Sequence, residues 1–398
     1  MDHQNDQYWT AAQAADMLGI SLPTLYAYVS RKGIRSVKVD GSRTRRYWSL
    51  DIERLMKGKG GDDSISTGAQ RVATTCSITH LTDQGLFYRG QDAIELARSS
   101  ATAEKVAELM WQVPDVFGSR LPKIPNVTGA LLKLFEGTTA AEKAIALFPL
   151  IELDNPRAHD LTMEGYARTS ADAVRWFAAL VVGAGAPEVR PLHGFIASHV
   201  GVDSAFEDLI RQVLILSVDH ERDPSTYCVR AAANTGVTPY YAAIAGLVSF
   251  RGRRVSYSRR ETVSRLLEEI CSSREPAGPI LQRYRQGELL PGFGSSAQGV
   301  ADPRAQHLLT ELKGLFGADE DFLRLVKACE VAEEVTGQPV DFILLLSFVG
   351  RKLGLAGQEI AVAGVGRMIG WLAHASEQFH QQPMGRTHSQ FVANLTDC

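Results

Sequence analysis

The sequence TCSITHLTDQGLFYRGQDAIELARSSATAEKVAELMW, residues 75–111, contains the change of pattern that indicates the fold. Its first part predicts a short hairpin, with strands over Ser77–Leu81 and Gly85–Tyr88. From Ala103 to Trp111, apolar residues recur at i, i+3, i+4 and i+7, which indicates an amphipathic helix. A hairpin followed by helices is therefore the expected start of a mainly helical domain.

Helical spacing continues to the end of the chain. The same apolar periodicity predicts helices over Asp160–Val182, Ala205–Val218, Pro239–Ser249, Asp321–Glu334 and Gln358–Gln378. Outside the hairpin, the only other strand-like stretch is Val37–Trp48. We expect a mainly α fold preceded by a small α/β module, with domains over residues 1–57 and 71–398 and a Gly/Ser-rich linker over 58–70.

Length and composition describe an ordinary globular chain. With 398 residues, at least two domains are expected. A net charge of -3 gives no global reason to bind nucleic acid or a membrane, so such a partner would need a local patch. The first residues do not resemble a secretory signal, and no apolar run approaches the roughly 18 residues of a membrane span, so we expect a cytoplasmic protein without a membrane partner.

The cysteines indicate neither disulfides nor a metal. Five of them, Cys76, Cys228, Cys271, Cys329 and Cys398, are scattered and never form a C-x-x-C pair. We expect them to be reduced and mostly buried, with no metal site and no bound cofactor.

The front of the chain predicts a helix, a tight turn and a second helix. Ala11, Ala14, Ala15 and Leu18 line one face, Gly19 permits the turn, and Ser21 caps the second helix, which carries Leu25, Tyr26 and Val29. This stretch resembles the helix-turn-helix of MerR and excisionase proteins. The following VKVDGSRTRRYWSL is similar to the wing of that family, a hairpin turned at Asp40-Gly41.

A local basic patch accompanies this module. One acid, Asp40, stands among seven basic residues: Arg31, Lys32, Arg35, Lys38, Arg43, Arg45 and Arg46. In winged helix-turn-helix proteins the second helix enters the major groove and wing cations neutralise phosphates. We expect Thr24, Tyr28 and Arg31 to face bases and Lys32, Arg43, Arg45 and Arg46 to contribute to DNA binding. The alternative is that the module docks on the larger domain and that its charged side chains are merely solvated. A DNA-binding module of this size reads only a short half-site, so specific binding would also require a dimer.

From residue 75 onward the chain resembles the citrate synthase family, the condensing enzymes of the tricarboxylic acid cycle. The hairpin with Y-R-G and the helix with E-x-V-A-x-L-x-W open that resemblance, and VDHERDPSTY (218–227), GFGSSAQGVADPRA (292–305), QPVDF (338–342), GVGRMIGWLAHASEQ (364–378) and RTHSQFVA (386–393) continue it in register. The resemblance implies an all-α dimer whose large and small domains, the small one over roughly 222–330, close over oxaloacetate and acetyl-CoA.

The motifs imply a carboxylate site. His220, Arg304 and Arg367 take the positions of oxaloacetate ligands, Arg386 that of an arginine reaching the neighbouring subunit, and Asp341 that of the catalytic base. Three permanently charged arginines with a histidine donor are also what a dicarboxylate requires on chemical grounds. A dicarboxylate such as oxaloacetate is therefore the expected ligand, with a CoA thioester as a further ligand or co-substrate.

Both histidines that the family uses in catalysis are missing. The position of the first falls on Val255, in RGRRVSYSRRE, and the position of the second on Ser295. Valine has no hydrogen-bonding group, and serine has no proton affinity suited to acid catalysis near neutrality. A partial copy of the first motif around His193 lies too early in the chain to replace it. Arginines of the same loop, Arg251, Arg253, Arg254, Arg259 and Arg260, either attract the phosphates of a CoA-like ligand or are simply solvated.

Three functions fit this pattern. The first is a catalytically impaired pseudoenzyme that keeps the carboxylate pocket and acts as a metabolite-responsive DNA-binding regulator or regulatory subunit. The second is an active citrate or 2-methylcitrate synthase that condenses acetyl-CoA or propionyl-CoA with oxaloacetate, in which the front module is accessory. In the third, the chain forms a heterodimer with an intact citrate synthase paralogue instead of a homodimer, and Arg386 completes the partner's site.

Turnover separates these functions. Loss of one oxyanion donor costs about 10²–10³ in rate and loss of a general acid or base about 10²–10⁴. We expect turnover of acetyl-CoA with oxaloacetate to be at least roughly a thousandfold below that of a relative with both histidines, because neither loss is compensated locally. A thiol-release assay on the purified protein measures this, and ordinary turnover would establish the enzyme instead.

Overall fold

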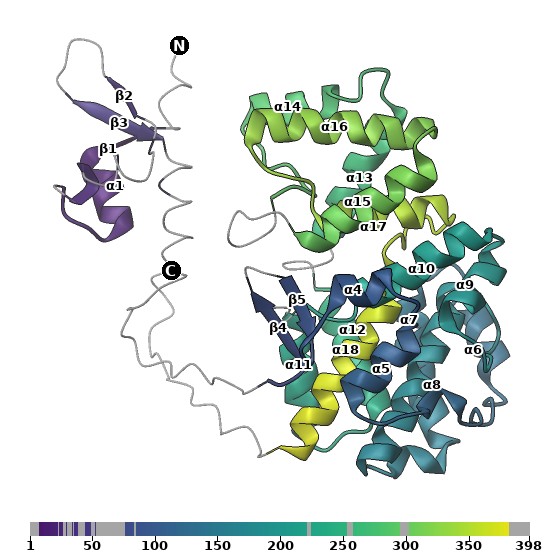
Figure 1. Ribbon diagram of the computed structural model, residues 1–398. Coiled ribbons are helices and arrows are strands. Elements are labelled where there is room, and N and C mark those ends of the chain that lie inside the picture. Colours follow the sequence, from purple (N-terminus) through teal and green to yellow (C-terminus); the bar gives the residue numbers. More distant parts are fainter. Residues whose placement is uncertain are drawn as a thin grey trace. The chain divides into compact units, whose positions relative to one another are not determined.

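The computed structural model describes residues 8–22, 24–26, 29, 34, 36–38, 44–48, 52, 76–82, 85–220, 224–252, 258–294 and 302–381. The chain divides into two compact units, Met1–Ala73 and Thr74–Cys398, and each is described by itself (Figure 1). The predicted linker over 58–70 lies outside the described residues.

The front unit begins with a capped helix. Helix α1 (Ala11–Leu18) follows Thr10, whose hydroxyl accepts from the backbone N–H of Gln13 at 3.3 Å, while the Gln13 side chain accepts from the backbone of Thr10. The helix ends at Gly19, which takes a φ of +61° that glycine adopts without strain. Beyond the turn, Leu22, Thr24–Tyr26 and Val29 are helical, which agrees with the predicted second helix.

A three-stranded antiparallel sheet completes this unit. Strand β3 (Arg45–Trp48) lies between β1 (Tyr8–Thr10) and β2 (Ser36–Lys38), with Lys38 opposite Arg45. Its Tyr47 is buried in a small core with Ala14, Ala15, Leu18, Leu25, Ile34 and Ile52. The strands expected between Val37 and Trp48 are therefore present, and β1 adds a third that the periodicity did not indicate.

The larger unit opens with the predicted hairpin. Strands β4 (Thr79–Thr82) and β5 (Gly85–Tyr88) pair antiparallel, and β6 (Gln91–Asp92) continues the sheet. Asp92 then caps the first helix of the unit with its carboxylate, which accepts from the backbone of Ile94 at 2.7 Å.

Helices make up most of this unit. They are α4 (Ala93–Arg98), α5 (Ala103–Trp111), α6 (Thr128–Leu134), α7 (Ala140–Leu153), α8 (Met163–Val181), α9 (Leu192–Val200), α10 (Ser204–Leu216), α11 (Pro224–Ala233), α12 (Pro239–Phe250), α13 (Ser258–Ser272), α14 (Gly278–Gln286), α15 (Pro303–Phe316), α16 (Glu320–Thr336), α17 (Phe342–Lys352) and α18 (Ala361–His380). Short 3-10 turns lie at Val116–Gly118 and Pro156–His159. The mainly α fold is thus confirmed.

The predicted helices are present, with small differences at their ends. α8 begins at Met163 instead of Asp160 because the Thr162 hydroxyl caps it, accepting from the backbone of Gly165 at 3.1 Å. α18 begins three residues later than expected, after a short segment of turns around Gln358. None of the helices in the described ranges combines the length and apolar character needed to cross a membrane.

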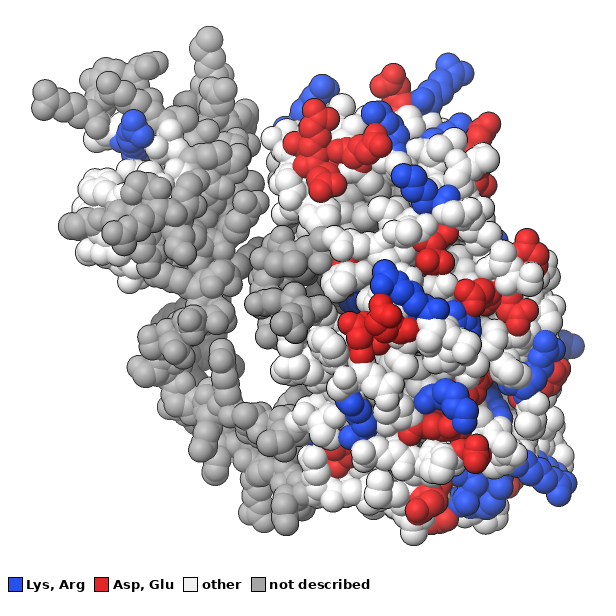
Figure 2. Space-filling model, viewed as in Figure 1, with Lys and Arg blue, Asp and Glu red and all other residues white. Residues whose placement is uncertain are grey.

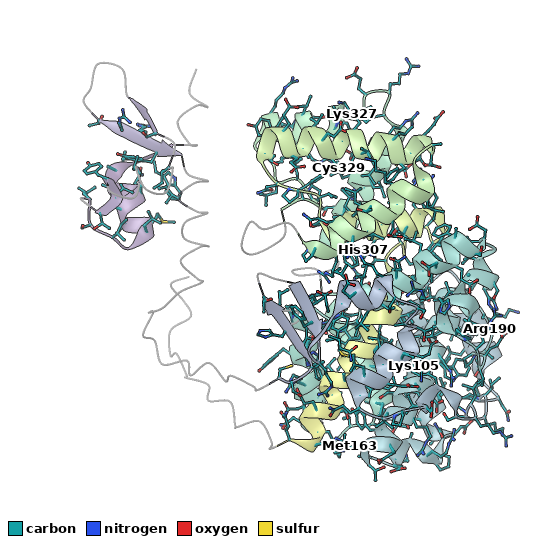
Figure 3. All side chains as sticks on the ribbon, in the orientation of Figure 1. Lys105, Met163, Arg190, His307, Lys327 and Cys329 are labelled. Atoms are coloured by element: carbon teal, nitrogen blue, oxygen red, sulfur yellow. The ribbon has the colours of Figure 1, made fainter. Side chains whose placement is uncertain are left out.

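The helices of the larger unit form two groups. α13–α17 pack on one another, whereas α11 and α12 pack with α7, α8 and α18 (Figure 1). The smaller group therefore runs over residues 258–352, whereas the sequence suggested roughly 222–330. One polar link between the groups is His307 of α15, labelled in Figure 3, whose Nε2 lies 2.6 Å from the Gln212 side-chain oxygen of α10.

Helix α18 is the central element of the larger group. It contacts α5, α8, α10, α11 and α12, and its residues from Val362 to Ser376 are all buried. A helix that is buried all round needs apolar or paired side chains on every face, which agrees with its near-continuous apolar sequence. Two glycines let it approach the α10 segment closely, since a Cβ at Gly366 would overlap the Leu214 carbonyl and one at Gly370 the Val218 carbonyl.

This close approach can be tested by adding a single methyl group. Gly370→Ala must push α18 away from Val218, and we expect it to lower the free energy of unfolding by about 1–3 kcal/mol, the usual cost of overpacking. The matched control is Gly314→Ala in α15, where an added Cβ meets nothing within 4 Å. Because alanine favours helix over glycine, the control should be neutral or stabilise by up to about 1 kcal/mol. Denaturant unfolding measures both, and equal effects would contradict the assigned packing.

Candidate functional site

The larger unit contains a buried carboxylate, Asp219, that is paired with charged side chains of helix α18. It follows α10, is fully buried, and accepts from two side chains of α18. Arg367 Nη1 donates to its Oδ1, and His374 Nε2 lies 2.8 Å from its Oδ2. Burial opposes ionisation of Asp219, but the positive charges of Arg367 and His374 hold its pKa well below its usual range. The two partners are seven residues apart and share one face of the helix.

Arg367 is held on several sides. Besides Asp219, its guanidinium donates to the Val218 carbonyl at 3.0 Å and to the Thr226 hydroxyl of α11. One turn later, Trp371 Nε1 donates to Ser225 at 2.9 Å. The Ser225-Thr226 pair of the motif at 218–227 therefore anchors α11 to α18, and Arg367 is a buried structural group as well as a candidate ligand.

The next group combines His220, Asp302 and Arg304. Arg304, in the first turn of α15, donates from Nε to Asp302 Oδ1 at 3.1 Å and from Nη2 to Oδ2 at 2.7 Å, a bidentate pair. Burial opposes ionisation of Asp302, yet Arg304, and to a lesser degree His220, lower its pKa. His220 follows Asp219 directly in the chain, and a joint role of His220 and Arg304 in binding a ligand stays a prediction.

Tyr88 connects the hairpin to the same place. Its hydroxyl lies 3.1 Å from the carbonyl oxygen of Ile215 and 3.3 Å from that of Asp219. Burial raises the pKa of Tyr88, and the charge of Arg304 opposes that rise. Arg304, Asp219 and Tyr88 thus act on one another electrostatically, so the hairpin, α10, α15 and α18 converge on one site.

Asp341 lies on a neighbouring loop and caps a helix. Its Oδ1 accepts from the backbone N–H of Leu344 at 3.1 Å, in the first turn of α17. Its own backbone N–H donates to Gly292 at 2.8 Å, and the N–H of Gly294 donates to Pro339 at 3.0 Å. The G-F-G segment therefore runs beside Asp341. The ring of the next residue, Phe342, lies 4.7 Å from the Arg304 guanidinium.

Glycine is required at both ends of the G-F-G segment. Gly292 has a φ of +85° and Gly294 a φ of +62°, and added Cβ atoms would press on Leu344 and Gln338 respectively. Ser295 follows directly but lies outside the described residues, as do Val255 and Arg386.

Two of the loop arginines that could have attracted phosphates, Arg251 and Arg260, make contacts within the chain. Arg251 pairs with Glu142 at 2.7 Å and donates to the Thr139 hydroxyl at 3.0 Å. Arg260 donates to the Phe250 carbonyl at 2.8 Å and lies over the Phe250 ring. Both guanidiniums therefore serve contacts within the chain, while Arg253 and Arg254 are outside the described residues and the Arg259 side chain is not described.

Sequence reasoning missed several residues that lie around His374, the partner of Asp219. Cys76, Arg230, His374 and Glu377 were not singled out, although the last two lie in the quoted motif GVGRMIGWLAHASEQ. One sequence signal could have identified His374: it lies seven residues after Arg367 and therefore shares the same face of the helix. The expectation of mostly buried cysteines was wrong for Cys76 and Cys228, which are exposed, while Cys271 is buried.

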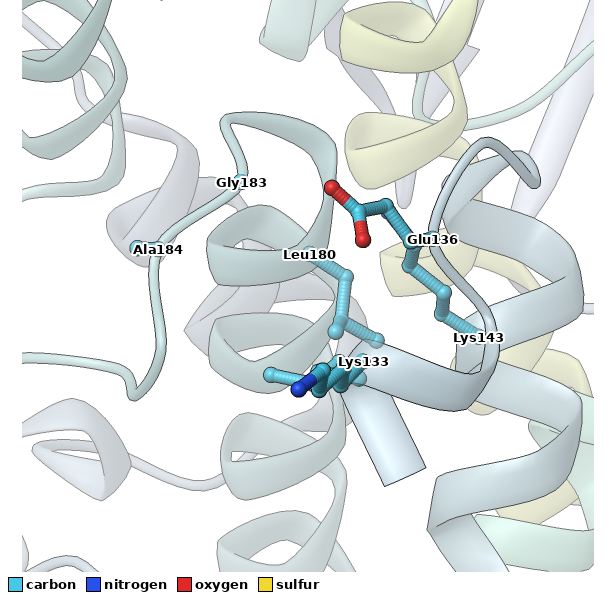
Figure 4. A pocket seen from close by; sticks show the side chains of 7 residues that line it. Lys133, Glu136, Lys143, Leu180, Gly183 and Ala184 are labelled. Atoms are coloured by element: carbon cyan, nitrogen blue, oxygen red, sulfur yellow. The ribbon is translucent and has the colours of Figure 1, made fainter. Parts of the chain in front are cut away.

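One cavity lies apart from the cluster. Its volume is about 420 Å³, and it is lined by α6, α7 and the end of α8, including Lys133, Glu136, Lys143 and Leu180 (Figure 4). No residue of the Asp219 or Arg304 groups lines it, so the charged cluster and not this cavity is the candidate site.

In the front unit the structure describes some of the residues that were expected to contact DNA, namely Thr24, Arg45 and Arg46. The Thr24 hydroxyl lies 2.8 Å from that of Ser21, and Arg45 Nη1 donates to the Ser36 hydroxyl on β2 at 3.0 Å. Arg45 and Arg46 are consecutive in β3, so their side chains point to opposite faces of the sheet. Tyr28, Arg31, Lys32 and Arg43 lie outside the described residues.

The larger unit offers no comparable basic area on the face shown in Figure 2. There, Lys and Arg side chains are interspersed with Asp and Glu. Any sequence-independent attraction to phosphates is therefore better sought in the front unit.

Comparisons with known proteins agree on both units. A family model described as citrate synthase, C-terminal domain, matches residues 68–388, and one described as a helix-turn-helix domain matches residues 9–60. The chain is 23% identical to citrate synthase 2 of Bacillus subtilis over 350 residues, which cover 81% of this chain and 94% of the relative. It is 33% identical to a citrate synthase of Synechocystis over 190 residues, covering 46% and 47%.

Solved structures show the same fold. The citrate synthase of Thermoplasma acidophilum, in a ternary complex with carboxymethyl coenzyme A and oxaloacetate, superposes with a TM-score of 0.68 at 19% identity, covering 84% of this chain and 97% of that one. The citrate synthase of Thermotoga maritima gives 0.67 at 22% identity, covering 83% and 97%.

Proposed function

Because the chain belongs to the citrate synthase family, we propose that it keeps that family's dicarboxylate pocket, has lost most of the catalysis, and couples the pocket to a DNA-binding module. In this role it is a metabolite-responsive regulator. The observation that carries the proposal is that Arg304 and Arg367 each hold a carboxylate, the largely buried Asp302 and the buried Asp219 respectively. At the two positions of the catalytic histidines, the chain has Val255 and Ser295.

The charges of the site suit a dianionic ligand, one carboxylate of which would replace the Asp302 carboxylate at Arg304. Asp302 occupies the fork of Arg304, and both side chains are largely buried. A ligand carboxylate that takes the place of Asp302 keeps the guanidinium bidentate while Asp302 turns to solvent. Arg304 can therefore alternate between an internal and an external carboxylate without being left unpaired, which would be costly.

Catalysis would depend on Asp341 alone among the family's three catalytic groups. Its carboxylate is 3% exposed and caps α17. With valine and serine at the other two positions, no imidazole stands there to polarise the ketone or stabilise an enol.

A second candidate function is condensation of acetyl-CoA or propionyl-CoA with oxaloacetate. The observation that favours it is the retention of Asp341 beside the G-F-G segment, together with relatives named citrate synthase. Residues that act as a unit lose activity non-additively, so residual turnover is compatible with the substitutions. Pairing with an intact paralogue, completed by Arg386, is the corresponding assembly for a regulatory subunit.

Dicarboxylate binding tests the pocket. We expect millimolar oxaloacetate or malate to raise the thermal midpoint, because a ligand that binds only the folded state stabilises it. Arg304→Ala should abolish the rise. Asp302→Asn is the matched variant: asparagine still caps α15 but no longer competes for the guanidinium, so the rise should be kept or enlarged. If wild type shows no shift in differential scanning fluorimetry, the pocket is a relic and the proposal fails.

DNA binding tests the front module. In mobility-shift titrations at two salt concentrations, binding should weaken steeply with salt, because neutralised phosphates release counterions. Arg45→Ala should weaken binding to all sequences and reduce the salt slope by about 1. Lys327→Ala, an exposed cation on α16, is the control and should change neither. Absence of binding by the full chain, or an equal loss in the control, would remove DNA from the proposed function.

A further inference from the structure

An exposed thiol lies beside the buried charge cluster. Cys76 Sγ is 3.8 Å from Nδ1 of His374, the residue whose Nε2 faces Asp219. The following residue, Ser77, donates from its backbone and its hydroxyl to Glu377 at 2.8 and 2.6 Å. Those two bonds tie the chain at Cys76 to α18, so the approach of sulfur to imidazole is fixed by the fold.

Cations surround this thiol. Arg230 of α11 lies 3.1 Å from His374 Nδ1 and 2.8 Å from Glu377, and Arg89 donates to the Ser77 hydroxyl at 3.0 Å. The immediate side-chain neighbour of Cys76 is His374, and the groups around Cys76, Ser77 and His374 include two guanidiniums, of Arg89 and Arg230, and the carboxylate of Glu377. Such a positive, partly open environment favours a thiolate.

Proton transfer from Cys76 to His374 gives each N–H of the imidazolium an acceptor, at the cost of the hydrogen bond that Arg230 donates to Nδ1 at 3.1 Å. As an imidazolium, His374 donates from Nε2 to Asp219 and from Nδ1 to the thiolate, while Arg230 keeps Glu377 as its acceptor. Burial opposes this protonation, but Asp219 outweighs it and raises the pKa of His374 to about 9. Burial would likewise raise the pKa of Cys76, yet the bond to His374 lowers it below the usual value.

Metal binding fits the same atoms less well. Cys76, His374 and Glu377 present ligand atoms within 4.8 Å of one another. The Arg230 guanidinium, however, already lies against two of them. A divalent cation would therefore meet a buried positive charge, whereas a thiolate gains from it.

We propose that Cys76 is a redox modification site, whose thiolate is generated by His374 and oxidised to sulfenic acid by hydrogen peroxide. The reaction balances within this cluster. Sulfur attacks one peroxide oxygen, the O–O bond breaks, and the departing hydroxide takes the Nδ1 proton of His374 to leave as water. The sulfur loses two electrons, the peroxide gains them, and a neutral imidazole remains.

Site-resolved labelling tests the reactivity. The full-length reduced protein is treated with limiting hydrogen peroxide and dimedone, and labelled peptides are quantified by mass spectrometry. Cys228, which is also exposed, is the internal reference. Cys76 should react at least about tenfold faster at pH 7, since rate follows thiolate fraction, and its iodoacetamide rate should rise at lower pH than that of Cys228. Equal rates with superimposed pH profiles would overturn the proposal.

Variants separate the role of His374 from simple exposure. His374→Gln should bring the rate at Cys76 down to that at Cys228, while Cys228→Ser should leave Cys76 unchanged. If His374→Gln does not fold, the wild-type pH profile still decides.

Discussion

The ion pairs of Asp219 are the constraint on which the larger unit depends. A carboxylate without solvent contact must be paired, and both partners, Arg367 and His374, come from the central helix α18. Close packing of α18 on the α10 segment, permitted by Gly366 and Gly370, brings those side chains within reach. Loss of the carboxylate would leave two buried cations facing each other, so the site and the core of this group are the same structure.

The second helix group brings a different kind of charge to the site. Arg304 and Asp302 are paired within α15 and its cap, and they meet the larger group through His220 and Tyr88. Because Asp302 satisfies Arg304 in the absence of ligand, the two groups can separate or close without leaving the guanidinium unpaired. In the proposed pocket, a ligand carboxylate replaces Asp302, whereas Asp219 stays paired with Arg367 and His374.

Motif spacing located much of this site before any coordinates. It pointed to His220, Arg304, Arg367 and Asp341, and the structure shows Asp341 beside the G-F-G segment. Motif spacing did not show that Arg367 is also the partner of a buried carboxylate, or that Asp341 caps α17. Motif spacing left open whether Arg251 attracts phosphates or is simply solvated, and the structure pairs its guanidinium with Glu142. Each of these differences comes from a contact between residues far apart in the chain, which periodicity and local motifs do not encode.

By itself, the sequence determined the helical fold of the larger unit and the helix-turn-helix at the front, and it predicts the absence of both catalytic histidines. These depend on apolar periodicity, capping residues and residue identity, all of which are local. Only the tertiary structure decided that Cys76 lies beside His374, 298 positions later, and that Arg230 and Glu377 complete their surroundings. The reason is physical: the charge state of a side chain depends on burial and on neighbours within a few ångströms, and folding alone selects those neighbours.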